Sequence, residues 1–212
     1  MRLLVLGATG GTGRSVIRQA GKRGYEITAF VRSPQKLGSL IDRVTVRQGD
    51  PRSVAELQKV LPGHVAVLSA LGPPGPGPTT ILREAARSTV DAMQIAGPRR
   101  LIVVSAAVLF RDLGFLGRVL RHTLLKNVAE DSAEMEHIVM ASGLDWTIVR
   151  PPRLTNGSLT GRYRAENGHL PGRSALASIS RADVAHFLLG ELEHGSHTHR
   201  IVGLTGGGRS RT

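Results

Sequence analysis

The chemically most informative residues lie near the start of the chain, where Gly7-Ala8-Thr9-Gly10-Gly11-Thr12-Gly13 follows a short apolar run. Glycine lacks a Cβ, so the backbone can turn sharply there and come close to a diphosphate. A segment with helical spacing follows, so the N–H groups of Gly11, Thr12 and Gly13 would point at phosphate from the positive end of a helix. This context predicts a dinucleotide-binding loop; the alternative is a tight turn without a ligand.

A second group that could bind phosphate follows the next apolar run, 25–31, where Arg32 and Ser33 stand side by side. A site that prefers NAD places Asp or Glu near this point, to bond the ribose 2′-hydroxyl. A guanidinium group instead suits the 2′-phosphate of NADP, through a charge-assisted contact. We therefore predict that NADPH is preferred over NADH. The alternative is that Arg32 is a solvated loop residue.

Alternating strands and helices must position these residues. Short apolar runs predict strands at 3–6, 25–31, 44–47, 64–71, 101–105, 146–149 and 200–202. Helical spacing and start signals predict helices at 12–23, 34–40, 51–60, 79–96, 127–142 and 180–192. The alternation predicts an α/β fold, a single doubly wound, Rossmann-like parallel sheet with helices on both faces. We expect one domain over 1–204, with a small substrate-side portion near its C-terminal end, and a mobile tail over 205–212.

Composition excludes several classes of site. The chain has 212 residues and no cysteine, which rules out disulfides, a thiolate nucleophile and cysteine-ligated metal centres. The net charge is +12, yet only 3% of residues are aromatic, too few for base-stacking platforms, so no nucleic-acid partner is expected. No apolar run is long enough to span a membrane, and the apolar run at the start is too short for the core of a signal peptide. We expect a cytoplasmic protein without a membrane partner.

The segments GATGGTGR, VRSP, GDP, SGLDWTIVRPPRLT and ISRADVAHFLL together resemble the atypical short-chain dehydrogenase/reductases. Within that family the chain is most similar to the NAD(P)H-binding flavin reductase/biliverdin-IXβ reductase group, and more distantly to the NmrA-like proteins. The resemblance covers essentially residues 1–204. It implies an NADPH-dependent oxidoreductase with an open pocket at the carboxyl ends of the strands.

The resemblance also implies roles for individual residues. Gly10 to Gly13 would bind the pyrophosphate, and Arg32 with Ser33 the 2′-phosphate. The remaining cofactor contacts would be Asp50 and Pro51 at the adenine, Leu71 and Gly72 at the ribose, Ser105 at the nicotinamide, and Pro151 to Leu154, Arg153 included, over the carboxamide. Asp50 could instead, or also, be the N-cap of the next helix.

The proton donor departs from the best-known members of the superfamily, which use a Tyr-x-x-x-Lys pair. The chain has only Tyr25 and Tyr163, and neither has a lysine four positions later. The candidate catalytic groups are therefore Ser105 and Glu136, with water as the alternative. Ser105 could equally be a contact that positions the carboxamide. Glu136 aligns where the resembled group often has a histidine, and Ala106 where many members have a serine. Both departures disfavour biliverdin as the substrate.

Basic and rigid segments border the expected crevice. Arg118, Lys126, Pro152 and Arg153 are predicted to contact a small, anionic or aromatic substrate. The basic and apolar segment 113–125 predicts a lid, with a membrane-surface helix as the alternative. The segment 72–78 (GPPGPGP) predicts a stiff loop over the cofactor, with a polyproline ligand as the alternative. His194, His197 and His199 are read as loop residues rather than metal ligands.

Three functions remain compatible with the sequence. The first is hydride transfer from NADPH to a flavin, a quinone or another planar acceptor. The second is an NADP(H)-binding sensor without turnover, and the third is a biosynthetic enzyme that uses the fold for a cyclisation or isomerisation. The expected assembly is a monomer or a weak homodimer.

Overall fold

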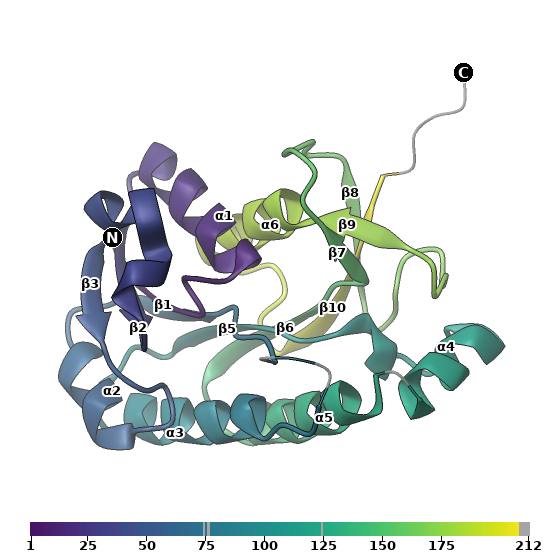
Figure 1. The fold of residues 1–212 in the computed structure, drawn as a ribbon, viewed down its shortest axis with the longest axis horizontal. Helices are drawn as coiled ribbons and strands as arrows, with labels where there is room; N and C mark the ends of the chain where they lie inside the picture. The colour runs from purple at the N-terminus through teal and green to yellow at the C-terminus, as the bar shows by residue number, and fades with distance from the viewer. Residues whose placement is uncertain (74, 76, 124, 208–212) are drawn as a thin grey trace.

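A mostly parallel, eight-stranded sheet separates two layers of helices (Figure 1). The computed structural model describes residues 1–73, 75, 77–123 and 125–207. The strand order is β3-β2-β1-β4-β5-β6-β10-β8, in which only β8 is antiparallel to its neighbour. The strands are β1 (Arg2–Leu6), β2 (Glu26–Val31), β3 (Thr45–Gln48), β4 (Ala66–Ser69), β5 (Arg100–Val104), β6 (Asp145–Arg150), β8 (Tyr163–Asn167) and β10 (Arg200–Gly206). The doubly wound α/β fold expected from the sequence is thus confirmed.

The helices divide between the two faces of the sheet. One face carries α1 (Gly11–Ala20) and α6 (Arg181–His194), and the other carries α2 (Val54–Val60), α3 (Ile81–Ala96) and α5 (Lys126–Met140) (Figure 1). A further helix, α4 (Gly114–His122), lies at one end of the molecule beside α5. Three 3₁₀ helices complete the set: η1 (Gly21–Arg23), η2 (Pro34–Arg43) and η3 (Ala107–Leu109).

Strand β1 shows why the sheet lies in the interior. Its residues Leu3 and Val5 pack into the apolar cluster on the α1–α6 side, and Leu4 and Leu6 into the cluster on the α3–α5 side. All four side chains are fully buried, as expected for a central parallel strand whose successive side chains point to opposite faces. Each such burial contributes about 1.5–3 kcal/mol.

A buried carboxylate fixes the start of α3. Asp131 on α5 is 1% exposed and accepts hydrogen bonds from the backbone N–H groups of Leu82 and Arg83, at 3.0 and 3.1 Å. The first turn of a helix leaves these donors without partners inside the helix. Asp131 therefore links α5 to the chain that emerges from β4, at the edge where the predicted site lies.

Several element boundaries differ from the sequence prediction. Helix α2 begins at Val54 with Ser53 as its N-cap, rather than at Pro51, so Asp50 is not its cap. Ser33 makes no side-chain cap at η2. Strand β10 extends to Gly206, so the first two residues of the expected tail belong to the sheet, and residues 208–212 lie outside the described part.

Three strands were not predicted at all. They are β8 at the edge of the main sheet and the pair β7 (Arg153–Thr155) and β9 (Ser178–Ser180), which form a separate two-stranded sheet. Their sequences contain no apolar run, because β7 and β8 are only partly buried and β9 is only three residues long. Within the described residues, no helix is long and apolar enough to cross a membrane.

Candidate active site

The glycine-rich loop lies where β1 passes into α1, at the carboxyl end of the sheet. Gly7 adopts φ +73°, and a Cβ there would collide with the carbonyl of Ala70; a Cβ on Gly13 would collide with the carbonyl of Gly7. No side chain caps the start of α1, so the N–H groups of its first turn point into the space after β1 without a protein side-chain partner. The loop therefore has the close packing and the free donors that a bound diphosphate requires.

A cavity of about 1050 Å³ opens beside this loop. It lies next to β1 and β4, where the strand order of the sheet reverses, the place where ligands bind in doubly wound sheets. Its lining includes Gly10 to Thr12, Ala70 to Pro73, Val104 to Val108 and Pro151 to Leu154. The cavity thus unites four segments that sequence analysis assigned to one cofactor, including Leu71, Gly72, Ser105, Pro152 and Arg153. Gly7 and Thr9 are not part of the lining.

Ser105 is held by a buried ion pair beneath the cavity. Its Oγ lies 2.5 Å from Glu136 Oε1, while Arg150 Nε and Nη2 lie 2.9 and 2.5 Å from the two oxygens of the same carboxylate. The side chain of Glu136 is 2% exposed, and the guanidinium of Arg150 stacks 4.7 Å from the ring centre of Phe110. Glu136 is therefore a neighbour of Ser105 but not part of the cavity lining.

This arrangement fixes the direction of the Ser105 hydroxyl group. A carboxylate only accepts hydrogen bonds, so Ser105 donates its proton to Glu136. The oxygen of Ser105 then faces the cavity as an acceptor. A carboxamide N–H group is one donor that fits such an oxygen.

Arg32 and Ser33 follow β2, as expected. The side chain of Arg32 is exposed and, among the described residues, makes no hydrogen bond or ion pair. The side chain of Arg14 is already hydrogen-bonded within the protein, because its Nη1 donates to the carbonyls of Lys36 and Leu37 at 2.9 and 3.1 Å. Of these two arginines, Arg32 is the one whose charge is available to a ligand beside β2.

Asp50 lies two residues after the end of β3. Arg52 donates to both of its carboxylate oxygens, with Nη2 to Oδ2 at 2.6 Å, and this pairing is the main reason that the pKa of Asp50 lies below its ordinary value. Pro51 is buried next to it. Asp50 is thus held as a charged group by Arg52.

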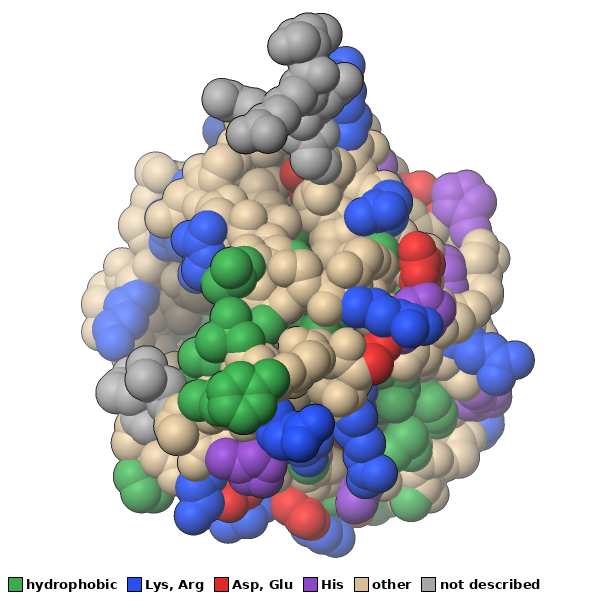
Figure 2. Space-filling view, turned by 90° about the vertical axis from the view of Figure 1, so that its right-hand side faces the viewer, with side chains coloured by type: hydrophobic (Ala, Val, Ile, Leu, Met, Phe, Trp, Pro, Cys, Tyr) green, Lys and Arg blue, Asp and Glu red, His purple; other side chains and the backbone are tan. Residues whose placement is uncertain are grey.

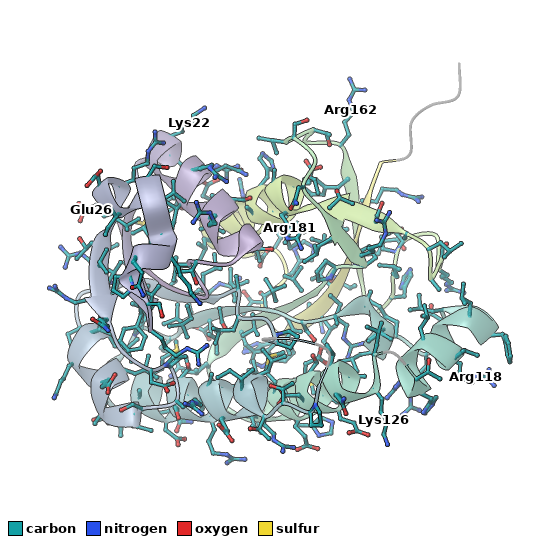
Figure 3. All side chains as sticks on the ribbon, viewed as in Figure 1. Lys22, Glu26, Arg118, Lys126, Arg162 and Arg181 are labelled. Atoms are coloured by element: carbon teal, nitrogen blue, oxygen red, sulfur yellow. The ribbon has the colours of Figure 1, made fainter. Side chains whose placement is uncertain are left out.

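The predicted substrate contacts separate into two groups. Pro152 and Arg153 line the cavity, whereas Arg118 and Lys126 are not part of its lining. Figure 3 shows Arg118 on the outer side of α4 and Lys126 on the side of α5 that faces away from the sheet. Lys126 lies 4.0 Å from Glu130. Beyond the cofactor segments most of the described lining is apolar, with Leu113, Leu120, Leu125, Val128 and Leu170 among its members. Its polar members there are Ser132, Ser174 and Arg181.

Arg181 is a site residue that sequence reasoning missed. Arg181 begins α6 after the N-cap Ser180 (Figure 3). Its side chain lies so close to Gly11 that a Cβ on Gly11 would collide with the Cδ of Arg181. Its Nη1 donates to Asn156 Oδ1 at 2.8 Å. The signal was the segment ISRADVAHFLL, which the resemblance used without giving the arginine a role.

The three clustered histidines have separate partners. His197 Nδ1 pairs with the buried Glu191 at 2.8 Å, His194 Nδ1 contacts the carbonyl of Gly190, and His199 Nε2 that of Leu144. In the described part of the chain, no group of three or more His, Cys, Asp or Glu residues could hold a metal ion.

Comparison with known proteins agrees with the geometry. Residues 7–195 match the model of a family described as NAD(P)H-binding. The yeast UPF0659 protein YMR090W is 30% identical over 93% of the chain and 89% of its own length, and the uncharacterised sugar epimerase YhfK of Bacillus subtilis is 27% identical over 98% and 95%. A solved structure, SP1627 of Streptococcus pneumoniae, carries the provisional name NADH-flavin reductase; it superposes with a TM-score of 0.80 at 25% identity, over 97% of this chain and 99% of its own.

Proposed function

The chain belongs to the NAD(P)H-binding family, and from that premise we propose that it reduces a planar small molecule, such as a flavin or a quinone, with NADPH. The observation that carries the proposal is the single cavity that runs from the N–H groups of α1, past Ser105, into an apolar chamber. At about 1050 Å³ it offers room for a nicotinamide and a second planar ring.

The residues present fit a nicotinamide dinucleotide. Gly7 and Gly13 form a cradle that a Cβ would fill, and the free N–H groups at the start of α1 suit its diphosphate. Arg181, which lies against Gly11, adds a positive charge beside the same place. When bound, the cofactor supplies a hydride.

The preference for NADPH rests on Arg32. The position after β2 carries a guanidinium without an ion-pair partner among the described residues, where an NAD site would carry a carboxylate. Ser33, beside it, is a second donor for the 2′-phosphate. This finer assignment goes beyond the family description, which names NAD(P)H without choosing between the two cofactors.

Ser105 has a positioning role in the proposed reaction. Glu136 and Arg150 orient its hydroxyl group, whose oxygen would accept a hydrogen bond from the carboxamide of a bound nicotinamide. Because Ser105 donates its hydroxyl proton to Glu136, the acceptor takes its proton from water.

A screen of NADPH oxidation against flavins, quinones and tetrapyrroles tests the proposal. We expect turnover with at least one class, at a rate well above that of the acceptor mixed with NADPH alone. Tight NADPH binding without oxidation by any class would instead support the cofactor sensor.

An isomerase is the second candidate, and the name of YhfK favours it. It would convert its substrate with no net change in NADPH. Incubation with candidate sugars, followed by chromatography of the products, separates this case from the reductase.

A further inference from the structure

Helix α4 has two apolar faces with different surroundings. Its inner face, with Gly117 and Leu120, lines the cavity. Its outer face leaves Phe115, Leu116 and Val119 with 79%, 44% and 39% of their surfaces exposed. An amphipathic helix on a protein surface normally presents polar side chains to water on its outer face. The outer face of α4 instead presents Phe115, Leu116 and Val119.

The exposed face continues into the mouth of the cavity. Leu176 is 75% exposed and also belongs to the cavity lining. We define the α4 patch as Phe115, Leu116, Val119 and Leu176. Figure 2, which looks onto this end of the molecule, shows a cluster of hydrophobic side chains bordered by Lys, Arg and His side chains.

Positive charge surrounds the α4 patch. Helix α4 contributes Arg118 and Arg121 and contains no acidic residue. Lys126 follows at the start of α5. The acidic residues nearby in sequence are paired: Asp112 lies 3.2 Å from Arg173, and Glu130 lies 4.0 Å from Lys126.

We propose that the α4 patch binds the surface of an anionic lipid bilayer, and that the acceptor is a lipid-soluble molecule that enters the cavity there. The second half rests on the reductase function proposed above. A basic helix with large apolar side chains is the feature that inserts into the headgroup region of anionic membranes. The apolar chamber behind it, walled by Leu113, Leu120, Leu125, Val128 and Leu170, suits a lipophilic ring.

A second copy of the chain fits the α4 patch less well. A two-fold dimer through this face would bring the arginines of both α4 helices close together, and like charges across an interface are repulsive. Anionic headgroups neutralise the same arginines. Charge complementarity therefore selects the lipid surface over the dimer.

Vesicle co-sedimentation tests the docking without any activity. We expect the protein to bind vesicles containing about one third phosphatidylglycerol in phosphatidylcholine, to bind pure phosphatidylcholine weakly, and to be released by salt. The double variant Phe115→Ser/Val119→Ser should bind roughly tenfold more weakly. Ile95→Ser is the matched control, because Ile95 is 71% exposed on α3 and lies outside the patch. Equal binding by all three proteins, or no binding, overturns the proposal.

Size-exclusion chromatography checks the competing occupant. A dimer that the double variant dissociates, without vesicle binding by the parent protein, would assign the patch to self-association and overturn the proposal.

Two acceptors test the entry route. With a water-soluble short-chain benzoquinone, the double variant should match the parent rate, because Phe115 and Val119 do not line the cavity. With a long-chain quinone in the anionic vesicles, it should be roughly tenfold slower, in step with its weaker docking. Equal loss with both quinones contradicts the entry route. If neither acceptor supports NADPH oxidation, the proposed reductase function fails. The membrane docking is then tested by the sedimentation experiment alone.

Discussion

At the scale of single residues, hydrogen bonding distinguishes the two arginines nearest the glycine-rich loop. Arg14 and Arg32 both lie near the glycine-rich loop in the chain, but Arg14 is bonded to two backbone carbonyls of η2. Arg32 remains exposed beside β2. Of the two, Arg32 is therefore the residue to which we assign the proposed preference for NADPH.

We predict that NADPH binds more tightly than NADH by about 2–4 kcal/mol, the order of a charge-assisted phosphate contact. Arg32→Ala should remove most of that difference and leave NADH binding unchanged. Calorimetric titration with both cofactors measures the difference in binding free energy. Arg47→Ala is the control for the loss of one positive charge. Equal affinities in the unmutated protein would contradict the assignment.

The bond from Ser105 to Glu136 makes a second prediction possible. Ser105→Ala should weaken NADPH binding by about 0.5–1.5 kcal/mol, because it removes one acceptor for the carboxamide. It should slow a quinone and a ferric acceptor, which needs no proton, by the same factor. If only the quinone rate fell, by roughly 100-fold, Ser105 would be a proton donor instead.

At the scale of elements, the start of α1 and the end of β1 form one unit. Gly10 illustrates this, because a Cβ there would lie 3.3 Å from the carbonyl of Gly7, so the loop needs only a small adjustment to accept it. The remaining side chain would occupy the space into which the N–H groups of α1 point.

Gly10→Val should therefore abolish cofactor binding while the fold survives. The control is Gly21→Ala at the other end of α1, where a Cβ meets nothing within 4 Å. Circular dichroism follows the fold and calorimetry follows NADPH. Normal binding by Gly10→Val would mean that the loop is only a structural turn.

A half-buried histidine couples β2 to the turn before β4 and makes stability depend on pH. His64 Nε2 lies 2.7 Å from Thr28 Oγ1, and its Nδ1 lies 3.1 Å from the carbonyl of Leu61. Partial burial is the main cause that lowers the pKa of His64 below its ordinary value of about 6.5. The unfolded chain therefore binds a proton at a higher pH than the folded chain does.

We expect the free energy of unfolding to be at its full value above about pH 6.5 and to fall as the pH drops from there toward the lower, folded-state pKa. His64→Gln keeps a polar group near Thr28 but cannot titrate, so its stability should change less over the same range. Urea unfolding at several pH values measures both proteins. A stability that rises on acidification in this range would contradict the sign.

At the scale of the whole molecule, cofactor binding should stabilise the fold as a unit. The proposed site joins the ends of β1, β4, β5 and β6, which belong to one sheet with a shared core. A ligand at 100 times its dissociation constant adds about 2.7 kcal/mol to the stability of such a protein.

NADPH at that concentration should raise the melting temperature by roughly 5–10 °C, and NADH at the same concentration by less. Differential scanning calorimetry measures both shifts in melting temperature. In the Arg32→Ala variant, the shifts with NADPH and NADH should become equal. A shift confined to NADH would reverse the proposed preference.

The sequence determined the alternation of the main strands and helices and the place of the glycine-rich loop. Central parallel strands such as β1 are buried on both faces, so their apolar runs are visible without neighbours, and the turn after β1 needs glycines for local steric reasons. Ser105 and Arg32 could be named because each follows such a run. These features depend on interactions within a few residues of one another.

Only the tertiary structure decided what depends on pairing across the chain. Strand β8 exists because β10 pairs with it, and its own residues give no signal. Glu136 was named as a catalytic group, yet Arg150 and Ser105 hold it beneath the cavity, and Arg181 reaches Gly11 from a helix 170 positions later. Periodicity records which face of an element is buried, but a contact between side chains requires the packed elements that bring them together.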